Sequence, residues 1–508
     1  MRIQYICHAC LRIDTGDVRL ATDPWFDGPA YSGQWHVFPR PLEPELLHQA
    51  EVVLISHAHE DHLHEPTLRR FAQNKLAVYP YYWDGDTVPY LREMGFSQVI
   101  EAPSYKTIRL TDRTTITFVT VGQDSVMVIE ANGRIVANVN DALHSCEPAI
   151  IDRVTAELKA RWPTIDTVFC GFGGASHFPN TIHCDGKDDM GVARVREELF
   201  VHNFCRIVKA LQPAVAVPFA ADFVLLADNQ RWINTVRFPR ERIPAYYDEH
   251  FRSGSDRVRI LPMYPGDVLE DNVLQDSSPY RRQMRNGSLG HLVAEQYAKE
   301  IRAIQERPPV QPSAIDDLEA SLTARLSDQA QGVSRARLGR MKFSIRLNDT
   351  VGALCLNVSF AGNAARVERA AAPAPGALFV LETHSGLFRS LFTHPWAGDV
   401  LIIGYGGEIR VTDSDAIKDG LLRTATDLLT AYPNPISYTR RHPVRIARYA
   451  LQNLDRVVER IKPRIERNAV ATGNSKDFNG EAANLFATEA RKTRKILLSP
   501  WQIISGSG

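Results

Sequence analysis

Short apolar runs, each ended by polar or turn-forming residues, recur along the first part of the chain. They cover residues 3–6, 18–21, 52–55, 77–81, 116–121, 126–129 and 135–139. Runs of this length and composition favour buried β-strands. Asn132 and Gly133 separate the last two runs, and this pair predicts a tight β-hairpin. Strands therefore dominate this part of the chain, as in one half of a β-sandwich that carries helices on its outer faces.

Helical periodicity alternates with further strands after residue 140. Residues 147–162 and 197–211 repeat apolar side chains every three or four positions, which predicts amphipathic helices. Buried strands are expected at 168–170 and 215–219. This order of elements predicts that residues 1–275 form an α/β domain.

The remainder of the chain has a different pattern. Residues 276–332 are polar, helical in period and interrupted by prolines, which predicts a helical linker. Residues 333–440 return to strands and end in a helix, which predicts a small α+β domain that resembles the sterol-carrier type. Residues 441–508 are arginine-rich with a helical period, typical of a solvated helical tail.

Composition and charge exclude several classes of protein. The 508 residues exceed what a single hydrophobic core usually serves, so more than one domain is expected. Lys and Arg number 59 and Asp and Glu also 59, so no net charge draws the chain to nucleic acid or an anionic membrane. Seven scattered cysteines suit a reducing compartment, and no apolar stretch approaches the ~20 residues that span a bilayer. We expect a cytoplasmic protein with no nucleic-acid partner and no membrane span.

The loop after the apolar run 52–55 carries the strongest chemical signal. It places His57, His59, Asp61 and His62 within six consecutive positions. Imidazole and carboxylate are ligands that zinc, iron and manganese accept. On an extended segment, the first two histidines can face one ion while Asp61 and His62 turn toward a second. The alternative is a solvated histidine-rich loop, which the buried strand before it disfavours.

This string resembles the signature of the metallo-β-lactamase superfamily, which implies an αββα sandwich with a dinuclear metal site. Residues 7–13 and 21–26 resemble the first two strands of the branch that contains the ascorbate-phosphate lactonases and N-acylphosphatidylethanolamine phospholipase D. Residues 173–179, 211–213 and 218–220 resemble the catalytic domain of CMP-N-acetylneuraminate hydroxylase, and that likeness runs through about residue 270. The expected fold is therefore a metallo-β-lactamase sandwich followed by a smaller α+β domain.

The resemblance also implies which residues complete the metal site. The strand-terminal Asp141 matches the aspartate that bridges the two metals, although the same residue could instead cap a helix. The superfamily takes further histidines from positions that correspond to 121–125 and 218–222, and both segments of this chain contain none. His8, in the motif of the first strand, is the best substitute. The other candidates are His144, His177, His183 and Asp222, of which His144 and His183 are expected to lie at the surface.

Further roles follow from position. We expect Asp61 or Asp141 to handle the proton of the reaction. Ser176 and His177 follow a glycine-rich turn, where the backbone can approach a ligand, and are the candidate substrate contacts. Asp23 is expected to orient a ligating imidazole, unless it only starts a turn.

Two activities are compatible with these residues. A diiron oxygenase acting on a small polar metabolite suits a site that is rich in carboxylates and retains open positions for O₂. Its electrons would come from a separate ferredoxin or reductase. The sequence lacks the motif of a Rieske iron–sulfur cluster, which is Cys-x-His with a later Cys-x-x-His. A hydrolase of the lactonase or phosphodiesterase type, with two zinc ions, is the alternative.

The length of the resemblance to the hydroxylase favours the oxygenase, with iron as the metal rather than zinc. A third class, a metal-binding protein without activity, is disfavoured because all four residues of the loop signature are present.

Overall fold

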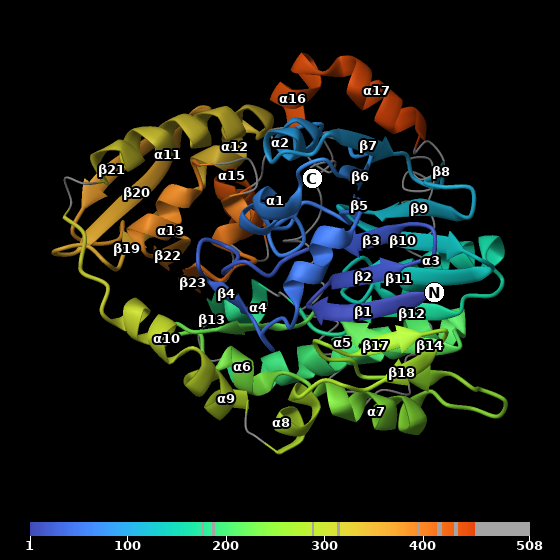
Figure 1. Cartoon of the computed structure of the whole chain (residues 1–508). Coiled ribbons are helices and arrows are strands. Elements are labelled where there is room, and N and C mark those ends of the chain that lie inside the picture. Colours follow the sequence, from blue (N-terminus) through green and yellow to red (C-terminus); the bar gives the residue numbers. More distant parts are fainter. Residues whose placement is uncertain are drawn as a thin grey trace. The chain divides into compact units, whose positions relative to one another are not determined.

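The computed structural model describes residues 1–174, 177–184, 188–286, 289–311, 315–393, 397–413, 419–430 and 435–452. Its chain forms two compact units (Figure 1). Unit 1 comprises Met1–Tyr81, Asp86–Ala175 and Arg196–Arg307; unit 2 comprises Tyr82–Gly85, Ser176–Val195 and Pro308–Gly508. Most of the expected helical tail, residues 453–508, lies outside the described residues.

Unit 1 is built on two large sheets. The first has the strand order β18 (Val273–Gln275), β17 (Val268–Glu270), β1 (Arg2–Cys7), β2 (Cys10–Asp14), β3 (Arg19–Thr22), β5 (Val52–Leu54), β6 (Leu76–Pro80) and β7 (Gln98–Ala102). The second has the order β16 (Arg259–Ile260), β14 (Val215–Phe219), β12 (Thr167–Gly171), β11 (Arg134–Asn140), β10 (Asp124–Ala131), β9 (Thr114–Val121) and β8 (Thr107–Arg109). A separate pair joins β4 (Trp35–Val37) to β15 (Phe223–Leu225).

Apolar side chains from both sheets form one buried cluster, which includes Leu11 and Leu54 of the first sheet and Phe118 and Phe169 of the second. A second cluster joins the other face of the second sheet to three helices: α3 (Pro148–Arg161), α5 (Asp189–Leu211) and α7 (Ile243–His250). Helices α1 (Glu65–Phe71) and α2 (Thr87–Glu93) lie beside β5 to β7 in Figure 1. The predicted αββα sandwich is confirmed.

The predicted hairpin is also confirmed. Ala131 pairs with Arg134 across a two-residue turn, and β10 and β11 continue the pairing as far as Met127 and Asn138. Asn132 and Gly133 have φ values of 51° and 73°. Two consecutive positive φ values are those of a type I′ turn, which asparagine and glycine adopt with little strain.

The segment expected to be a linker begins with helices that belong to unit 1. These are α8 (Tyr280–Asn286), α9 (Leu289–Gln296) and α10 (Ala298–Gln305). Val293, Tyr297 and Ile301 share a small buried cluster with Phe38 and Val224. The remaining short helices of unit 1 are η1 (Pro44–Gln49), α6 (Ile233–Val236) and η2 (Arg240–Arg242). The domain limits at 275, 332 and 440 stay predictions.

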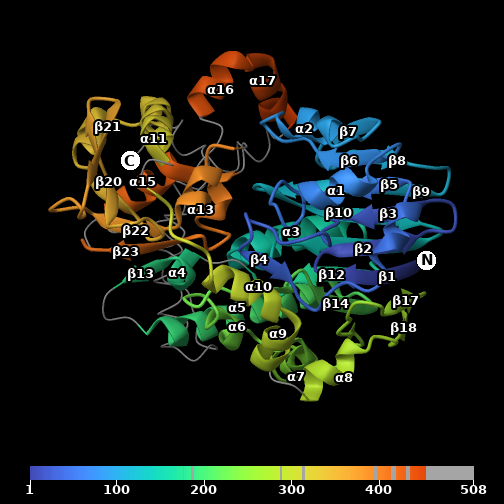
Figure 2. The same cartoon turned by 60° about the vertical axis from the view of Figure 1, so that its left-hand side comes forward.

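The described residues of unit 2 contain one sheet, with the order β13 (Ile182–Cys184), β23 (Gly407–Val411), β22 (Phe379–Thr383), β19 (Phe343–Leu347), β20 (Leu354–Ala361) and β21 (Ala364–Ala370). Its helices are α4 (His177–Asn180), α11 (Asp316–Gln329), η4 (Ala330–Gly332), α12 (Arg335–Gly339), α13 (Ser385–Ser390), η5 (Ala397–Val400), α15 (Leu421–Thr430), α16 (Pro435–Arg441) and α17 (Pro443–Gln452). Helix α11 lies along β21, as Figure 2 shows from a second side. The likeness to sterol-carrier domains stays a prediction.

Within the described ranges, no helix combines the length and the apolar character needed to cross a membrane.

The boundary between the two units, at Arg307 and Pro308, predicts where a protease should first cut the chain. Residues 305–309 are exposed. Among the bonds within residues 1–452, the one after Glu306 should therefore be the first that a Glu-specific protease cuts. The two fragments should still co-elute on native size exclusion, because β13 pairs in parallel with β23 on the other side of the cut. Mass spectrometry of the first products checks this. A first cut inside Met1–Tyr81 would contradict the division into units.

Candidate metal centre

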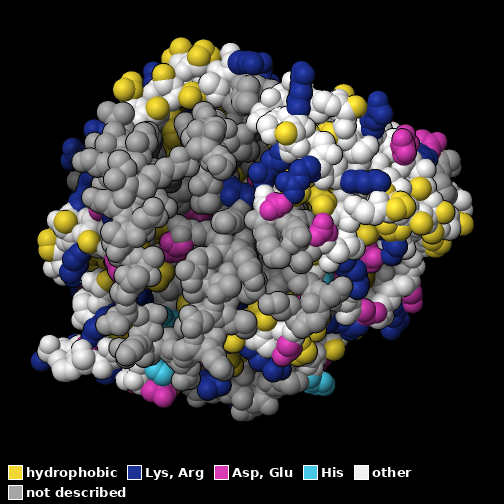
Figure 3. Space-filling model, turned by 180° about the vertical axis from the view of Figure 1, so that it is seen from behind, with side chains coloured by type: hydrophobic (Ala, Val, Ile, Leu, Met, Phe, Trp, Pro, Cys, Tyr) yellow, Lys and Arg dark blue, Asp and Glu magenta, His cyan; other side chains and the backbone are white. Residues whose placement is uncertain are grey.

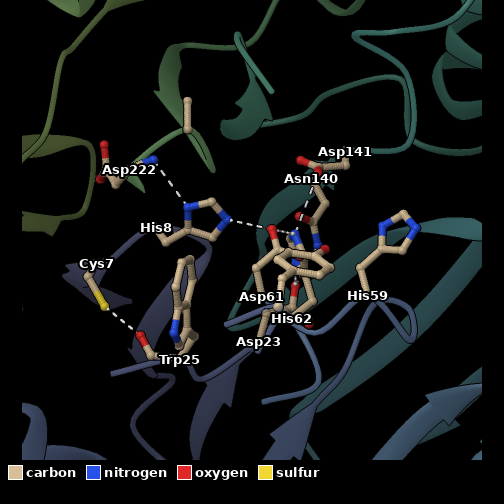
Figure 4. A network of polar contacts seen from close by, with 12 residues as sticks. Cys7, His8, Asp23, Trp25, His59, Asp61, His62, Asn140, Asp141 and Asp222 are labelled. Atoms are coloured by element: carbon tan, nitrogen blue, oxygen red, sulfur yellow. Dashed lines mark hydrogen bonds and ion pairs between the residues drawn. The ribbon is translucent and has the colours of Figure 1, made fainter. Parts of the chain in front are cut away.

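The loop after β5 is held from behind by a buried aspartate. Asp23 accepts a hydrogen bond from the backbone N–H of Ser56 at 2.7 Å through Oδ1, and one from Asn140 Nδ2 at 2.5 Å through Oδ2. It thereby connects the ends of three strands, β3, β5 and β11. Its Oδ2 also lies 3.3 Å from His62 Nδ1 (Figure 4). Asp23 therefore contacts one imidazole of the loop, His62, and its role in orienting a ligand stays a prediction.

One group of possible ligands consists of His57, His59 and Asp124. His57 Nε2 lies 2.8 Å from His59 Nδ1 and 3.5 Å from Asp124 Oδ1. On the other side of the ring, His57 Nδ1 lies 2.8 Å from Ser56 Oγ, which fixes the ring orientation. The three side chains thus offer two imidazole nitrogens and one carboxylate to a common point.

Two more groups share His62. One is His57, His62 and Asp141, and the other is His8, Asp61 and His62. His62 Nε2 lies 3.3 Å from Asp61 Oδ2 and 3.4 Å from Asp141 Oδ2. Because His57 and His62 each belong to two groups, the three groups form one continuous cluster.

The charges in this cluster shift its pKa values strongly. Burial lowers the pKa of His57, and the neighbouring His62 and His59 lower it further. Burial also opposes the charge on His62, but the carboxylates of Asp61, Asp141 and Asp23 outweigh this effect and raise its pKa well above the usual range. Partial burial raises the pKa of Asp124 to about 6. Negative charge is thus concentrated around His62, where a cation would be stabilised.

The donor atoms of this cluster are better placed to bind a metal ion than to form hydrogen bonds with one another. Among the described residues, both ring nitrogens of His62, Oδ1 of Asp124 and Oδ1 of Asp141 are buried without a hydrogen-bond partner. Leaving one buried polar atom unpaired typically costs about 1–3 kcal/mol. Several such atoms around one point are expected where they ligate a cation, and histidine and carboxylate are a suitable donor set for iron or zinc.

The cluster is buried on one side and accessible on the other. The side chains of His57, Asp61 and His62 are at most 4% exposed, whereas those of Asp124 and Asp141 are 24% and 22% exposed. A substrate can therefore approach from the side of the last two carboxylates.

Several residues named from the sequence have other surroundings. Asp222 forms a buried ion pair with Arg240, and His183 lies 2.8 Å from Asp189. His144 was expected at the surface, but it is 3% exposed, so that expectation was wrong. Its buried Nδ1 has no hydrogen-bond partner among the described residues. The predictions for Ser176 and His177 fall on side chains outside the described residues.

The structure adds two residues that the sequence analysis missed. Asp124 lies in the segment where a third histidine was sought, and a carboxylate there was overlooked because the search was for an imidazole. Tyr31 donates a hydrogen bond from its Oη to Asp61 Oδ1 at 2.6 Å. No local pattern around Tyr31 distinguishes it from a core tyrosine.

Comparisons with known proteins agree with this geometry. Residues 2–170 match the model of the beta-lactamase superfamily domain. The chain is 27% identical over 285 residues to a cytidine monophosphate-N-acetylneuraminic acid hydroxylase of Danio rerio, covering 53% of this chain and 46% of that protein. The human relative, described as inactive, is 27% identical over 289 residues, which is 53% of this chain and 54% of that protein. The chain spans about half the length of the curated relatives it matches.

A solved structure, an isothiocyanate hydrolase from Delia radicum gut bacteria, aligns with 53% of this chain and 99% of its own at a TM-score of 0.39 and 15% identity. The resemblance to the metallo-β-lactamase superfamily and to the hydroxylase is confirmed. Residues 2–170 resemble this superfamily, and the donor set at the loop after β5 is one that can hold metal ions.

Proposed function

We propose that unit 1 is a dinuclear iron oxygenase that hydroxylates a small polar metabolite. The observation that carries this proposal is the group His57, His59 and Asp124. Two histidines and one carboxylate are a ligand set that non-haem iron oxygenases use. A carboxylate thus stands where the superfamily signature leads one to expect a third histidine. The sequence similarity to proteins named as hydroxylases supports the same class of reaction.

In this proposal His57, His59 and Asp124 would hold the first iron. Asp61 and His62 would hold the second, and Asp141, grouped with His57 and His62, would contribute a further carboxylate. The irons would supply the binding and reduction of O₂. The overall reaction inserts one oxygen atom into a C–H bond and reduces the other to water, consuming two electrons and two protons per turnover. A separate ferredoxin or reductase would deliver those electrons.

The chain's own residues orient the ligands and control access. Ser56 fixes the ring of His57, so that Nε2 is directed toward His59 and Asp124. Asp23 fixes the loop and faces His62. The burial of Asp61 and His62 keeps bulk water from one side of the centre. Asp124 and Asp141 border the accessible side, where substrate would bind.

Both signs of charge occur among the described side chains on the face drawn in Figure 3, as expected from equal totals of basic and acidic residues. The six cysteines with described side chains are all unpaired, which supports a reducing compartment such as the cytoplasm.

The second candidate function is a dizinc hydrolase of the lactonase or phosphodiesterase type. The complete signature of His57, His59, Asp61 and His62 favours it, because histidine and aspartate are ligands of catalytic zinc. The two activities differ in the metal they require and in their need for electrons.

Metal analysis of the full chain, purified without oxygen after growth in ⁵⁷Fe, distinguishes the two functions. We expect two irons per chain, with the Mössbauer spectrum of an antiferromagnetically coupled pair. His57→Ala should lose that pair, because His57 belongs to two of the ligand groups. His250→Ala, an imidazole that is 42% exposed on α7, should retain it. Two zinc ions that support ester or phosphodiester cleavage would overturn the oxygenase, and a protein without bound metal would overturn both activities.

A further inference from the structure

Both ring nitrogens of His8 have hydrogen-bond partners, and one of these partners, Asp61, belongs to the metal centre. It lies where β1 turns into β2, with a φ of 47°, and its ring is 1% exposed. The edge of the ring packs against Trp25, with centroids 5.1 Å apart, and against His62, with centroids 5.5 Å apart. Its position is therefore tightly defined, and the proton on the ring can be assigned from its partners.

Nδ1 of His8 faces a donor that cannot change its role. The backbone N–H of Asp222 donates to Nδ1 at 3.1 Å (Figure 4). A backbone N–H never accepts, so Nδ1 must present its lone pair and carries no proton. The backbone of His8 is held by the same loop, because Ala220 N–H donates to His8 O at 3.2 Å.

The loop that carries this N–H is itself anchored. The carboxylate of Asp222 pairs with Arg240, and both side chains are 6% exposed. Tyr5 Oη donates to Asp222 Oδ2 at 2.5 Å. These buried contacts place the Asp222 N–H against the ring of His8 and leave little freedom for the ring to turn.

The ring proton must therefore be on Nε2. This nitrogen lies 3.0 Å from Asp61 Oδ2, so His8 donates to that carboxylate. A nitrogen that bears a proton has no lone pair to offer a metal. Although His8, Asp61 and His62 lie close enough to share an ion, His8 cannot ligate it in this hydrogen-bond arrangement.

We propose that His8 and Tyr31 are positioning residues that hold Asp61 through hydrogen bonds to its two carboxylate oxygens. We also propose that His8 is not a metal ligand. Tyr31 Oη donates to Oδ1 at 2.6 Å while His8 Nε2 donates to Oδ2. This inference rests on the proposed function only in taking Asp61 as a ligand.

Two consequences follow for the second metal position. The two donors hold both oxygens of Asp61, so the carboxylate is already oriented when a cation binds and binding is favoured. The chain would then supply Asp61, His62 and Asp141 at this position, and the remaining coordination sites would stay open to O₂, water or substrate.

Titration of the full chain with Co²⁺ against a competing chelator tests this inference. His8→Gln keeps an N–H donor near the place of Nε2 and should bind two equivalents with an unchanged visible Co²⁺ spectrum. Tyr31→Phe removes one donor and should still bind two equivalents, with the second weakened about 10- to 100-fold. The melting temperature of the chelator-treated Tyr31→Phe protein should match that of the parent, which separates positioning from general destabilisation.

His62→Ala is the reference for loss of a true ligand, and it should bind one equivalent fewer. If His8→Gln also binds one equivalent fewer and loses the same visible bands, His8 is a ligand and the inference is wrong. If His62→Ala retains both equivalents, the assignment of Asp61 and His62 to a metal position fails instead. The two failures are therefore distinguishable, and neither depends on whether iron or zinc is the native metal.

Discussion

Asp141→Asn is expected to remove one of two bound metal ions and to lower turnover by more than about 100-fold, beyond the 10- to 100-fold typical of residues that only support a ligand. Asp141 Oδ2 lies 3.4 Å from His62 Nε2, and its buried Oδ1 has no hydrogen-bond partner among the described residues. Asparagine keeps the size of the side chain but loses the negative charge that would hold two cations together.

Metal content and activity should fall by different amounts in this variant. The metal that remains would still have its own ligands, but without its neighbour it could not perform the reaction. The helix-cap interpretation of Asp141 is wrong, because α3 begins at Pro148 and its N-cap is Glu147. Asparagine would have served nearly as well as a cap. Unchanged metal content and unchanged turnover would remove Asp141 from the site.

Asp124→Ala is expected to remove the other metal ion, the one held with His57 and His59. The first position would then keep two histidines, and the coupled iron pair should disappear from the Mössbauer spectrum while one iron remains. Asp112→Ala is the matched control, since this carboxylate lies between β8 and β9 and is 97% exposed. It should retain the pair.

Replacing Asp124 with histidine is more informative than removing its carboxylate. Three imidazoles suit zinc, whereas two imidazoles and a carboxylate suit iron. The variant should therefore retain two metal ions, but zinc should compete better with iron at the first position than in the parent chain. If zinc competes with iron equally well in the variant and in the parent chain, Asp124 does not contact the metal.

Local patterns in the sequence determined much of the fold and the centre of the site. The alternation of apolar runs and turns predicted the central strands of both sheets in unit 1, but not edge strands such as β7, β8 and β18, because burial of one strand is a property of a few neighbouring residues. His57, His59, Asp61 and His62 were recognisable because one loop carries them all. Asn132 and Gly133 determined their turn through their own φ preferences.

The resemblance had already identified Asp141, but only the tertiary structure showed that Asp124 and Tyr31 join the site. Asp124 reaches the loop from the start of β10, and Tyr31 reaches Asp61 from the segment before β4. Such contacts join residues that are far apart in sequence, so no periodicity or spacing reveals them.

The proton on His8 illustrates the same limit most clearly. The sequence identified His8 as an imidazole near the site and suggested a metal ligand. Whether an imidazole nitrogen can bind metal depends on which nitrogen carries the proton, and here the backbone N–H of Asp222 determines that. This N–H belongs to a residue 214 positions away. Its direction is set by the packing of β1 against the loop after β14, which only the folded chain specifies.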